Sequence, residues 1–147
     1  MVEQGFGSRS FRARSFWLVA VALGVAVLVA GCATVTVTKD SPPEAKREAV
    51  TERVTQRWAA LIKGDMDTAY TFLSPASRAA TSLAAYKARA RGNGFKQAKI
   101  EKVDCDVEVC QVSLTVVYDH RKMKGIPTLD HESWIIDEGQ VWYVWQP

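Results

Sequence analysis

The patterning of the chain changes at Gly92-Asn93-Gly94. Between residues 41 and 90, apolar residues recur every three or four positions, which is the spacing of one face of a helix. Beyond residue 94, apolar and polar residues alternate over several short stretches, which is typical of strands with one buried face. Helices followed by antiparallel strands predict an α+β fold, in which N-terminal helices pack in a curved, four-stranded antiparallel sheet.

The longest predicted helix follows Ser41-Pro42-Pro43-Glu44 and ends at Gly64. We expect Ser41 to cap the first free amides, Glu44 to complete a capping box and Pro42 to occupy the first helical position. Glycine is the usual residue just after a helix end, where the backbone turns left-handed. The apolar residues expected on one face of this helix are Val50, Val54, Trp58, Leu61 and Ile62.

Two shorter helices are expected next, one capped by Asp65 and one by Thr81 or Ser82, with a further turn starting at Ser74-Pro75. The strands that follow are predicted at about residues 97–105, 110–118, 128–136 and 141–145. The second strand alternates cleanly, whereas the alternation of the first slips near Ile100, which indicates a β-bulge.

An unbroken apolar run from Phe16 to Ala30 lies behind a short segment that contains Arg9, Arg12 and Arg14. A basic segment followed by an apolar run of this length predicts a secretory signal. The run is short for a membrane span, which needs about 20 apolar residues. An uncleaved membrane anchor and an ordinary secretory signal are the alternatives to the more specific interpretation that the next residues support.

The stretch Val29-Ala30-Gly31-Cys32 resembles the lipobox of bacterial lipoproteins. In that family the cysteine thiol receives a diacylglycerol, and the cysteine becomes the first residue of the mature chain. The resemblance implies a signal peptide at residues 1–31, followed at residues 32–43 by the lipidated Cys32 and a flexible tether. Ala33 stands where inner-membrane retention usually requires aspartate, so the resemblance implies an outer-membrane anchor that faces the periplasm.

Composition limits the rest of the chain to one domain, which we expect at residues 44–147. Removing residues 1–31 from the 147 leaves 116 residues, a common domain size. This part carries 16 Lys and Arg against 15 Asp and Glu, a net charge of about +1, although the pI of the whole sequence is 8.8. Nucleic-acid binding proteins need a basic field, so no nucleic-acid partner is expected. The expected partner is the membrane that holds the lipid anchor.

Cys105 and Cys110 remain as an even pair once Cys32 is assigned to the lipid. They flank residues 106–109, a stretch of the right length for a hairpin loop, which would place them opposite each other. Exported proteins meet an oxidising compartment, so we favour a disulfide. The alternatives are two reduced core thiols or half a metal site, but a metal needs further ligands that the nearby sequence does not supply.

Certain segments are similar in order and spacing to a known family. In the helical half they are Lys63-Gly64-Asp65, Phe72-Leu73-Ser74-Pro75 and Ser82-Leu83-Ala84-Ala85-Tyr86. In the strand half they are Trp134, Asp137-Glu138-Gly139 and Val141-Trp142-Tyr143. Together they resemble the nuclear transport factor 2-like superfamily over about residues 44–145. The resemblance implies a cone, in which a bent sheet wraps around the first helix and a pocket opens between helices and sheet.

The residues that we expect to line such a pocket are Trp58, Tyr70, Tyr86, Trp134 and Trp142. The same aromatic residues would equally suit an apolar core. Enzymes of the superfamily, such as ketosteroid isomerase and dehydratases, place an aspartate or histidine base in the pocket. The candidate acid and base groups, besides the two tyrosines above, are Tyr118, Asp119, His120, Asp130 and His131, and they form no such pattern.

The sequence therefore predicts a lipid-anchored accessory protein of the cell envelope without catalytic activity, cofactor or metal. It is expected to bind a small apolar ligand in its pocket or a protein partner on its sheet. The alternative is an isomerase- or dehydratase-like enzyme that uses an acid/base pair in the pocket. A homodimer formed through the outer sheet face is compatible with both hypotheses.

Overall fold

A computed structural model describes residues 36–90 and 94–146 of the chain. The helices are α1 (Pro43–Lys63), α2 (Met66–Thr71), α3 (Pro75–Ala80) and α4 (Leu83–Ala90). The strands are β1 (Gly94–Cys105), β2 (Val109–His120), β3 (Met123–Asp137) and β4 (Gln140–Tyr143). Within these described ranges, no helix combines the length and apolar character needed to cross a membrane. The predicted signal at residues 1–31 and Cys32 lie outside the described residues.

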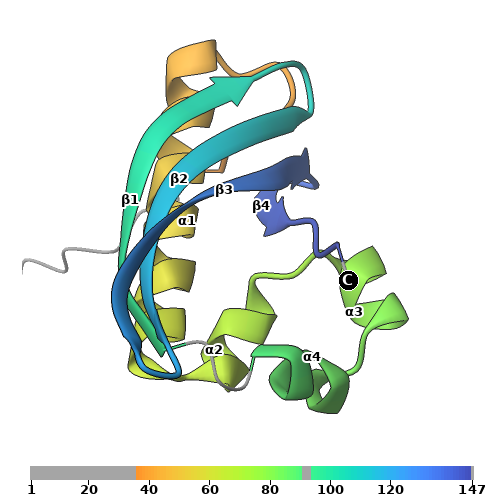
Figure 1. The fold of residues 1–147 in the computed structure, drawn as a ribbon. Helices are drawn as coiled ribbons and strands as arrows, with labels where there is room; N and C mark the ends of the chain where they lie inside the picture. The colour runs from red at the N-terminus through yellow and green to blue at the C-terminus, as the bar shows by residue number, and fades with distance from the viewer. Residues whose placement is uncertain (1–35, 91–93, 147) are drawn as a thin grey trace, which may run out of the picture. The chain divides into compact units, whose positions relative to one another are not determined.

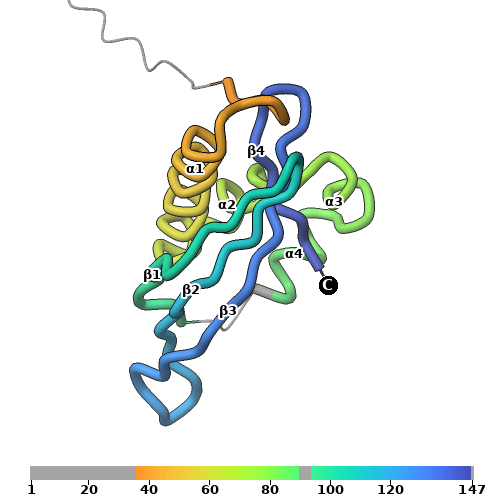
Figure 2. Tube along the Cα trace, turned by 90° about the horizontal axis from the view of Figure 1, so that it is seen from above, coloured from red at the N-terminus to blue at the C-terminus, as the bar shows by residue number. Residues whose placement is uncertain are grey.

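The four strands form one antiparallel sheet in the order β1-β2-β3-β4. The strands curve strongly, and all four helices lie on the inner side of the bend (Figure 1). Viewed from above, α1 runs alongside β1, and the hairpin between β2 and β3 extends beyond the helices (Figure 2). The predicted α+β class and the four-stranded antiparallel sheet are therefore confirmed.

The buried face of α1 follows the predicted helical spacing. Val50, Val54, Trp58 and Leu61 are buried in the core, whereas Ile62 is exposed. Gly64 ends the helix in the left-handed conformation, with φ of 77°, as predicted. Because successive residues of a helix point about 100° apart, Ile62 lies at the margin of the stripe centred on the other four residues.

The predicted capping box at the start of α1 is not formed. Pro42 is the N-cap residue, and no side chain caps the helix. The Ser41 hydroxyl instead accepts a hydrogen bond of 2.9 Å from the backbone N–H of Thr38. A serine hydroxyl can accept a hydrogen bond from a backbone N–H in a turn or at a helix end, and here it accepts one in the turn before the helix.

The predicted flexible tether ends earlier than residue 43. Val37 is 1% exposed and belongs to the hydrophobic core, and residues 39 and 40 form a turn that leads into α1. The Thr36 methyl group lies so close to Gly139, in the β3–β4 turn, that a side chain at Gly139 would clash with it. Burial of the Val37 side chain offsets the conformational entropy that this segment loses when it is ordered, so the domain begins before α1.

Short polar side chains start the next two helices, α2 at Asp65 as predicted and α3 at Ser74, where only a further turn was predicted. Asp65 accepts a hydrogen bond of 3.0 Å from the backbone N–H of Thr68 at the start of α2. Ser74 accepts one of 3.1 Å from the backbone N–H of Ser77 at the start of α3. These bonds satisfy amides that have no partner within the helix, which lets helices of six residues form.

The strand register confirms the irregularity predicted for β1. Its pairing with β2 shifts between Ile100 and Lys102, and again between Phe95 and Gln97. Strand β2 keeps its alternation, with Cys110, Val112 and Leu114 essentially inaccessible. Bulges increase the local twist of a strand, which helps β1 to follow the bend of the sheet.

Cys105 and Cys110 pair across the β1–β2 hairpin and are joined by a disulfide. The buried Lys46 of α1 holds the turn of this hairpin, since its Nζ donates to the carbonyl oxygen of Val107 at 2.8 Å and to that of Asp106 at 3.3 Å. The hairpin is therefore fixed in two ways, covalently between its strands and by hydrogen bonds to the first helix.

Candidate functional site

A buried ion pair lies between α1 and the inner face of the sheet. Arg57 is 3% exposed and Glu132 is 2% exposed. The Nη1 of Arg57 donates to Oε1 of Glu132 at 2.5 Å. Charged side chains are rarely buried unless they are paired, because removing a charge from water is costly. The pair is thus the most unusual chemical feature of the described core.

Each partner lies at an inward-facing position of its helix or strand. Arg57 lies three residues after Val54 on α1, and Glu132 lies two residues before Trp134 on β3. The indole N–H of Trp134 donates to Oε2 of Glu132 at 2.9 Å, so both carboxylate oxygens accept a hydrogen bond. Periods of about 3.6 in the helix and 2 in the strand place these charges on the buried faces.

Aromatic rings enclose the guanidinium of Arg57. Its Cζ lies 3.7 Å from the centroid of the Tyr143 ring and 5.6 Å from that of Trp58. Tyr143 in turn contacts Trp134 and Trp145, with ring centroids 5.4 Å and 6.2 Å away. Contacts of a cation with ring faces add to the attraction of Glu132 and compensate part of the lost hydration of Arg57.

Burial and the neighbouring charge shift the pKa values of these groups. Burial lowers the pKa of Arg57, but Glu132, Tyr143 and Tyr86 together outweigh it and the net pKa is raised. Burial raises the pKa of Glu132, and Arg57 and Trp134 offset only part of that effect. The pKa of Tyr143 is also raised by burial, so its hydroxyl stays protonated. Arg57 is the fixed charge of the site, and Glu132 is the group whose charge responds to pH.

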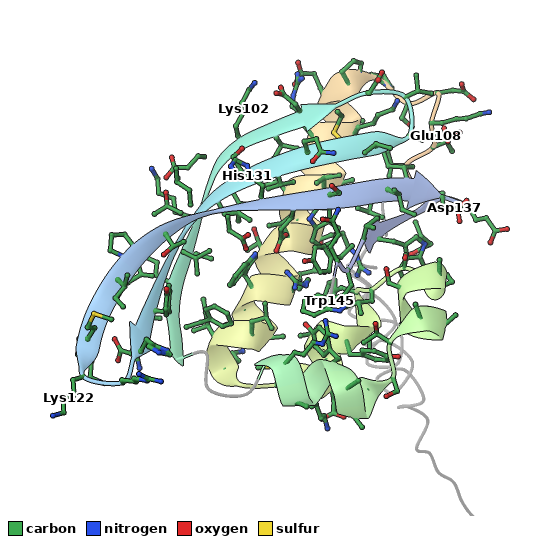
Figure 3. All side chains as sticks on the ribbon, turned by 45° about the vertical axis from the view of Figure 1, so that its right-hand side comes forward. Lys102, Glu108, Lys122, His131, Asp137 and Trp145 are labelled. Carbon is green, nitrogen blue, oxygen red and sulfur yellow. A yellow bond between two sulfur atoms is a disulfide. The ribbon has the colours of Figure 1, made fainter. Side chains whose placement is uncertain are left out.

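The rings around Arg57 (Trp58, Trp134, Tyr143 and Trp145) form an aromatic cluster, which continues toward α4. Tyr86 of α4 meets Trp145 edge-on, with centroids 5.0 Å apart, and lies 5.6 Å from Tyr70 of α2. The Tyr70 hydroxyl is satisfied, because it donates to the carbonyl oxygen of Thr81 at 2.8 Å. Trp145 follows the last strand and lies between the sheet and the short helices (Figure 3). Helices and strands distant in sequence thus meet in one aromatic cluster.

Four buried polar atoms in this region have no hydrogen-bond partner among residues 36–90 and 94–146. They are Nε of Arg57, Nε1 of Trp58, the hydroxyl oxygen of Tyr86 and Nε1 of Trp145. The large majority of buried side-chain polar atoms in proteins have a partner, so four on adjoining side chains require an explanation. The Tyr86 hydroxyl also helps to raise the pKa of Arg57, in part through a side-chain hydrogen bond, so its oxygen lies within reach of the guanidinium N–H groups.

The structure brings together four of the five residues predicted to line a pocket. Trp58, Tyr86 and Trp134 are buried and Tyr70 is half-buried, all in or against the aromatic cluster. Trp142 lies apart from them, because side chains alternate along β4 and Trp142 faces away from its neighbour Tyr143. The Trp142 ring instead lies 5.2 Å from the guanidinium of Arg78 on α3.

Most of the candidate acid and base groups lie away from this cluster. His131 is exposed on the outer face of the sheet (Figure 3), where its ring meets the Ser113 hydroxyl at 3.2 Å. Asp119 accepts a hydrogen bond from the Gly125 N–H at 2.9 Å, and this bond lowers its pKa. Asp130 is half-buried on the same face of β3 as Glu132, and its charge contributes to the raised pKa of that carboxyl.

Two surface hollows lie elsewhere in the domain. One, of about 490 Å³, opens between residues 38–40, Glu108 and the β3–β4 turn. The other, of about 440 Å³, lies beside the disulfide and Arg47. Neither is lined by any of the five predicted aromatic residues. Across the described ranges, no three His, Cys, Asp or Glu side chains gather as ligands for a metal ion.

Comparison with known proteins finds solved structures with a similar fold. No protein-family model matches the chain, and no curated protein sequence matches it. A SEC-C motif containing protein from Rhodopseudomonas palustris has a similar structure, with a TM-score of 0.55 and 14% identity over 75% of this chain and 80% of that one. A protein from Campylobacter jejuni described as an NTF2-like transpeptidase gives a TM-score of 0.48 and 12% identity over 65% of this chain and 98% of that one. The first likeness shows a shared fold and no more.

Proposed function

We propose that this protein is a lipid-anchored accessory protein of the cell envelope whose domain binds a small apolar ligand and catalyses no reaction. In this proposal Cys32 carries the lipid, the anchor lies in the outer membrane, and the domain faces the periplasm. The bent sheet with helices on its inner side supports assignment of the domain to the nuclear transport factor 2-like type. In that type a pocket opens between the helices and the sheet.

The observation that carries the proposal is the group of unpartnered polar atoms inside the aromatic cluster. Leaving a buried donor without an acceptor costs about 1–3 kcal/mol for each group. A domain that only needed a core would gain stability from apolar residues at these positions. A bound molecule that supplies the missing partners accounts both for the polar atoms and for the aromatic rings around them.

The absence of catalysis is proposed because the carboxylate in the cluster is already occupied. Glu132 accepts hydrogen bonds from Arg57 and Trp134, one at each oxygen. A general base must reach a proton of its substrate, and an oxygen held in this way is not free to do so. The imidazole of His131 lies on the outer face of the sheet and is no substitute.

One observation favours the enzyme as a second candidate. Burial raises the pKa of Glu132, and carboxyl groups with raised pKa values are common among catalytic acids and bases. If a substrate displaced Arg57 from Glu132, that carboxyl would become available, with Asp130 as a neighbouring second acid. Under this alternative, Glu132→Gln would abolish turnover, whereas a binding domain would keep its ligand or lose affinity only in part.

Native mass spectrometry on the protein purified gently from its own host membranes tests the proposal. We expect a discrete added mass on the domain, in addition to the lipid, that is lost on unfolding. A domain that carries only its lipid would refute the proposed ligand and favour a protein partner on the sheet. In the same preparation, Cys32→Ser should move the protein from the membrane fraction to the soluble fraction, and unchanged fractionation would refute the lipid anchor.

A further inference from the structure

We propose that the hairpin between β2 and β3 is a second membrane contact, which docks on a bilayer that contains anionic phospholipid. The strands of this hairpin pair as far as His120 with Met123, and Arg121, Lys122 and Lys124 lie within four consecutive positions. The inference goes beyond the proposed function and involves no ligand of the aromatic cluster. It rests on that function only because the lipid anchor would bring the hairpin close to a bilayer.

The end of the hairpin has a surplus of positive charge. Lys96, near the start of β1, has its Nζ 3.6 Å from Oδ2 of Asp119, and the Nζ of Lys124 lies 3.2 Å from the same oxygen. One carboxylate therefore faces two ammonium groups. Arg121 and Lys122 form no salt bridge with any carboxylate of residues 36–90 and 94–146. We call Lys96, Arg121, Lys122 and Lys124 the basic tip, which with Asp119 has a net charge of +3.

An apolar side chain lies among these cations. Met123 is 58% exposed, and its neighbours on both sides are exposed as well. The hairpin extends beyond the helices, so they do not cover it (Figure 2). An exposed methionine gains little from a soluble polyanion, but it gains from burial at the boundary between lipid headgroups and acyl chains. Cations around an exposed apolar side chain therefore favour a bilayer over other anionic partners.

The fold allows the anchor and the basic tip to meet one bilayer. The two turns at the opposite end of the sheet carry acids such as Glu108 and Asp137 (Figure 3). The chain enters the domain at this acidic end, since Thr36 lies against Gly139. From Cys32 to Thr36 the chain spans at most about 14 Å, at ~3.6 Å per residue. This reach exceeds the Debye length of about 8 Å, so the acidic end stays clear of the headgroup charges while the basic tip meets them.

An environment-sensitive label on the hairpin tests the contact. His120→Cys supplies a free thiol there, because Cys105 and Cys110 form the disulfide. The protein, purified from its host membranes with its lipid, is labelled with nitrobenzoxadiazole and reconstituted into vesicles of phosphatidylcholine, alone or mixed with phosphatidylglycerol. We expect a blue shift of the label only where phosphatidylglycerol is present. The shift should disappear at about 1 M salt, where the Debye length is ~3 Å.

Charge variants test which cations make the contact. Arg121→Asn plus Lys122→Gln removes the two unpaired cations, and asparagine suits the left-handed φ of 53° at position 121. Each cation near an anionic surface favours docking by about five-fold, so this variant should lower the ratio of docked to undocked label by about 25-fold. Lys99→Gln plus Lys102→Gln is the matched control, because it removes the same charge from the exposed face of β1. Equal losses in the two variants would refute the proposal.

Met123→Gln separates a bilayer from a soluble acidic partner. Glutamine keeps the length of the side chain, and we expect docking to weaken by about five-fold, as for burial of roughly half of a methionine side chain. Soluble polyglutamate is the competitor. If Met123→Gln docks as well as the wild type and polyglutamate displaces the hairpin from the vesicles, the basic tip binds acidic polymers and the inference is wrong.

The same vesicles distinguish this inference from the proposed function. Flotation with phosphatidylcholine vesicles reports the lipid anchor alone, because these vesicles carry no net charge. Protein that does not float with them refutes the anchor, whereas the label still reports docking on vesicles with phosphatidylglycerol. A label that shifts equally in both kinds of vesicle, or in neither, refutes the second contact and leaves the anchor standing.

Discussion

Replacing Arg57 with methionine should destabilise the domain strongly. Methionine keeps an apolar stem of similar length but removes the charge that faces Glu132 at 2.5 Å and the Tyr143 ring at 3.7 Å. Removing one member of a buried ion pair costs about 3–5 kcal/mol, because the remaining charge has lost its partner. Since Glu132 is 2% exposed, water cannot take the place of the guanidinium. We expect a loss of this size near neutral pH.

The cost of Arg57→Met should depend on pH in a defined direction. Burial raises the pKa of Glu132 in the native protein, and the loss of Arg57 removes a cause that lowers it. A carboxyl whose folded pKa lies above its unfolded value favours folding when protonated. The stability that protonated Glu132 contributes is therefore fully present below the unfolded pKa of about 4.3. This contribution is lost as pH rises through the folded pKa, by about 1.4 kcal/mol per pH unit. The variant should be closest to wild type in acid.

Urea denaturation followed by tryptophan fluorescence measures both effects, at about pH 5 and about pH 8. Arg53→Met is the matched control. Arg53 is half-buried one turn earlier on α1, donates to the carbonyl oxygen of Val141 at 3.3 Å, and lies 4.3 Å from the Phe72 ring. It has no carboxylate partner among the described residues, so its loss should cost about 1 kcal/mol at either pH.

The double variant Arg57→Met with Glu132→Gln completes the test. Glutamine keeps an oxygen for the Trp134 indole N–H and removes the unpaired charge. We expect it to recover part of the stability that Arg57→Met loses at about pH 8, and to lack the added pH dependence. A cost below about 1 kcal/mol for Arg57→Met, or the same cost at both pH values, would refute the reasoning that the pair is buried and coupled.

Three further predictions concern the anchor, the hairpin and the core. Cys32→Ser should release the protein into the soluble fraction, and thiol labelling under non-reducing conditions should leave Cys105 and Cys110 unmodified. Reactive thiols at these two positions would contradict the disulfide. Breaking it with Cys105→Ser plus Cys110→Ser should lower stability by less than the ~3 kcal/mol estimated for a 15-residue loop, because the closed loop is shorter. Trp58→Ala should cost about 3–5 kcal/mol in urea denaturation, because Trp58 is 5% exposed, and a mild loss would place it at an accessible wall.

The order of elements could be predicted from sequence because strong local signals mark it. Gly64, Asp65 and Ser74 act at helix ends through their own backbone freedom or side-chain oxygens, so their effect does not depend on the rest of the fold. The hairpin could also be predicted locally, because Cys105 and Cys110 flank a stretch of hairpin-loop length. Ser41 misled the prediction because its hydroxyl had a second local partner, the Thr38 N–H, and sequence alone does not decide between two such bonds.

The ion pair at the centre of the candidate site was not predicted from the sequence, because Arg and Glu are rarely buried and their residue types indicate exposure. Arg57 continues the spacing of Val50 and Val54, and Glu132 alternates with Trp134, so periodicity placed both charges on faces that the fold buries. An isolated charge at either position would argue against burial. Two opposite charges, one on the inward face of a helix and one on the inward face of a strand, satisfy each other once these faces meet. The signal was therefore present in the sequence, but it is visible only when the two inward faces are taken as a pair, because the partners are 75 residues apart.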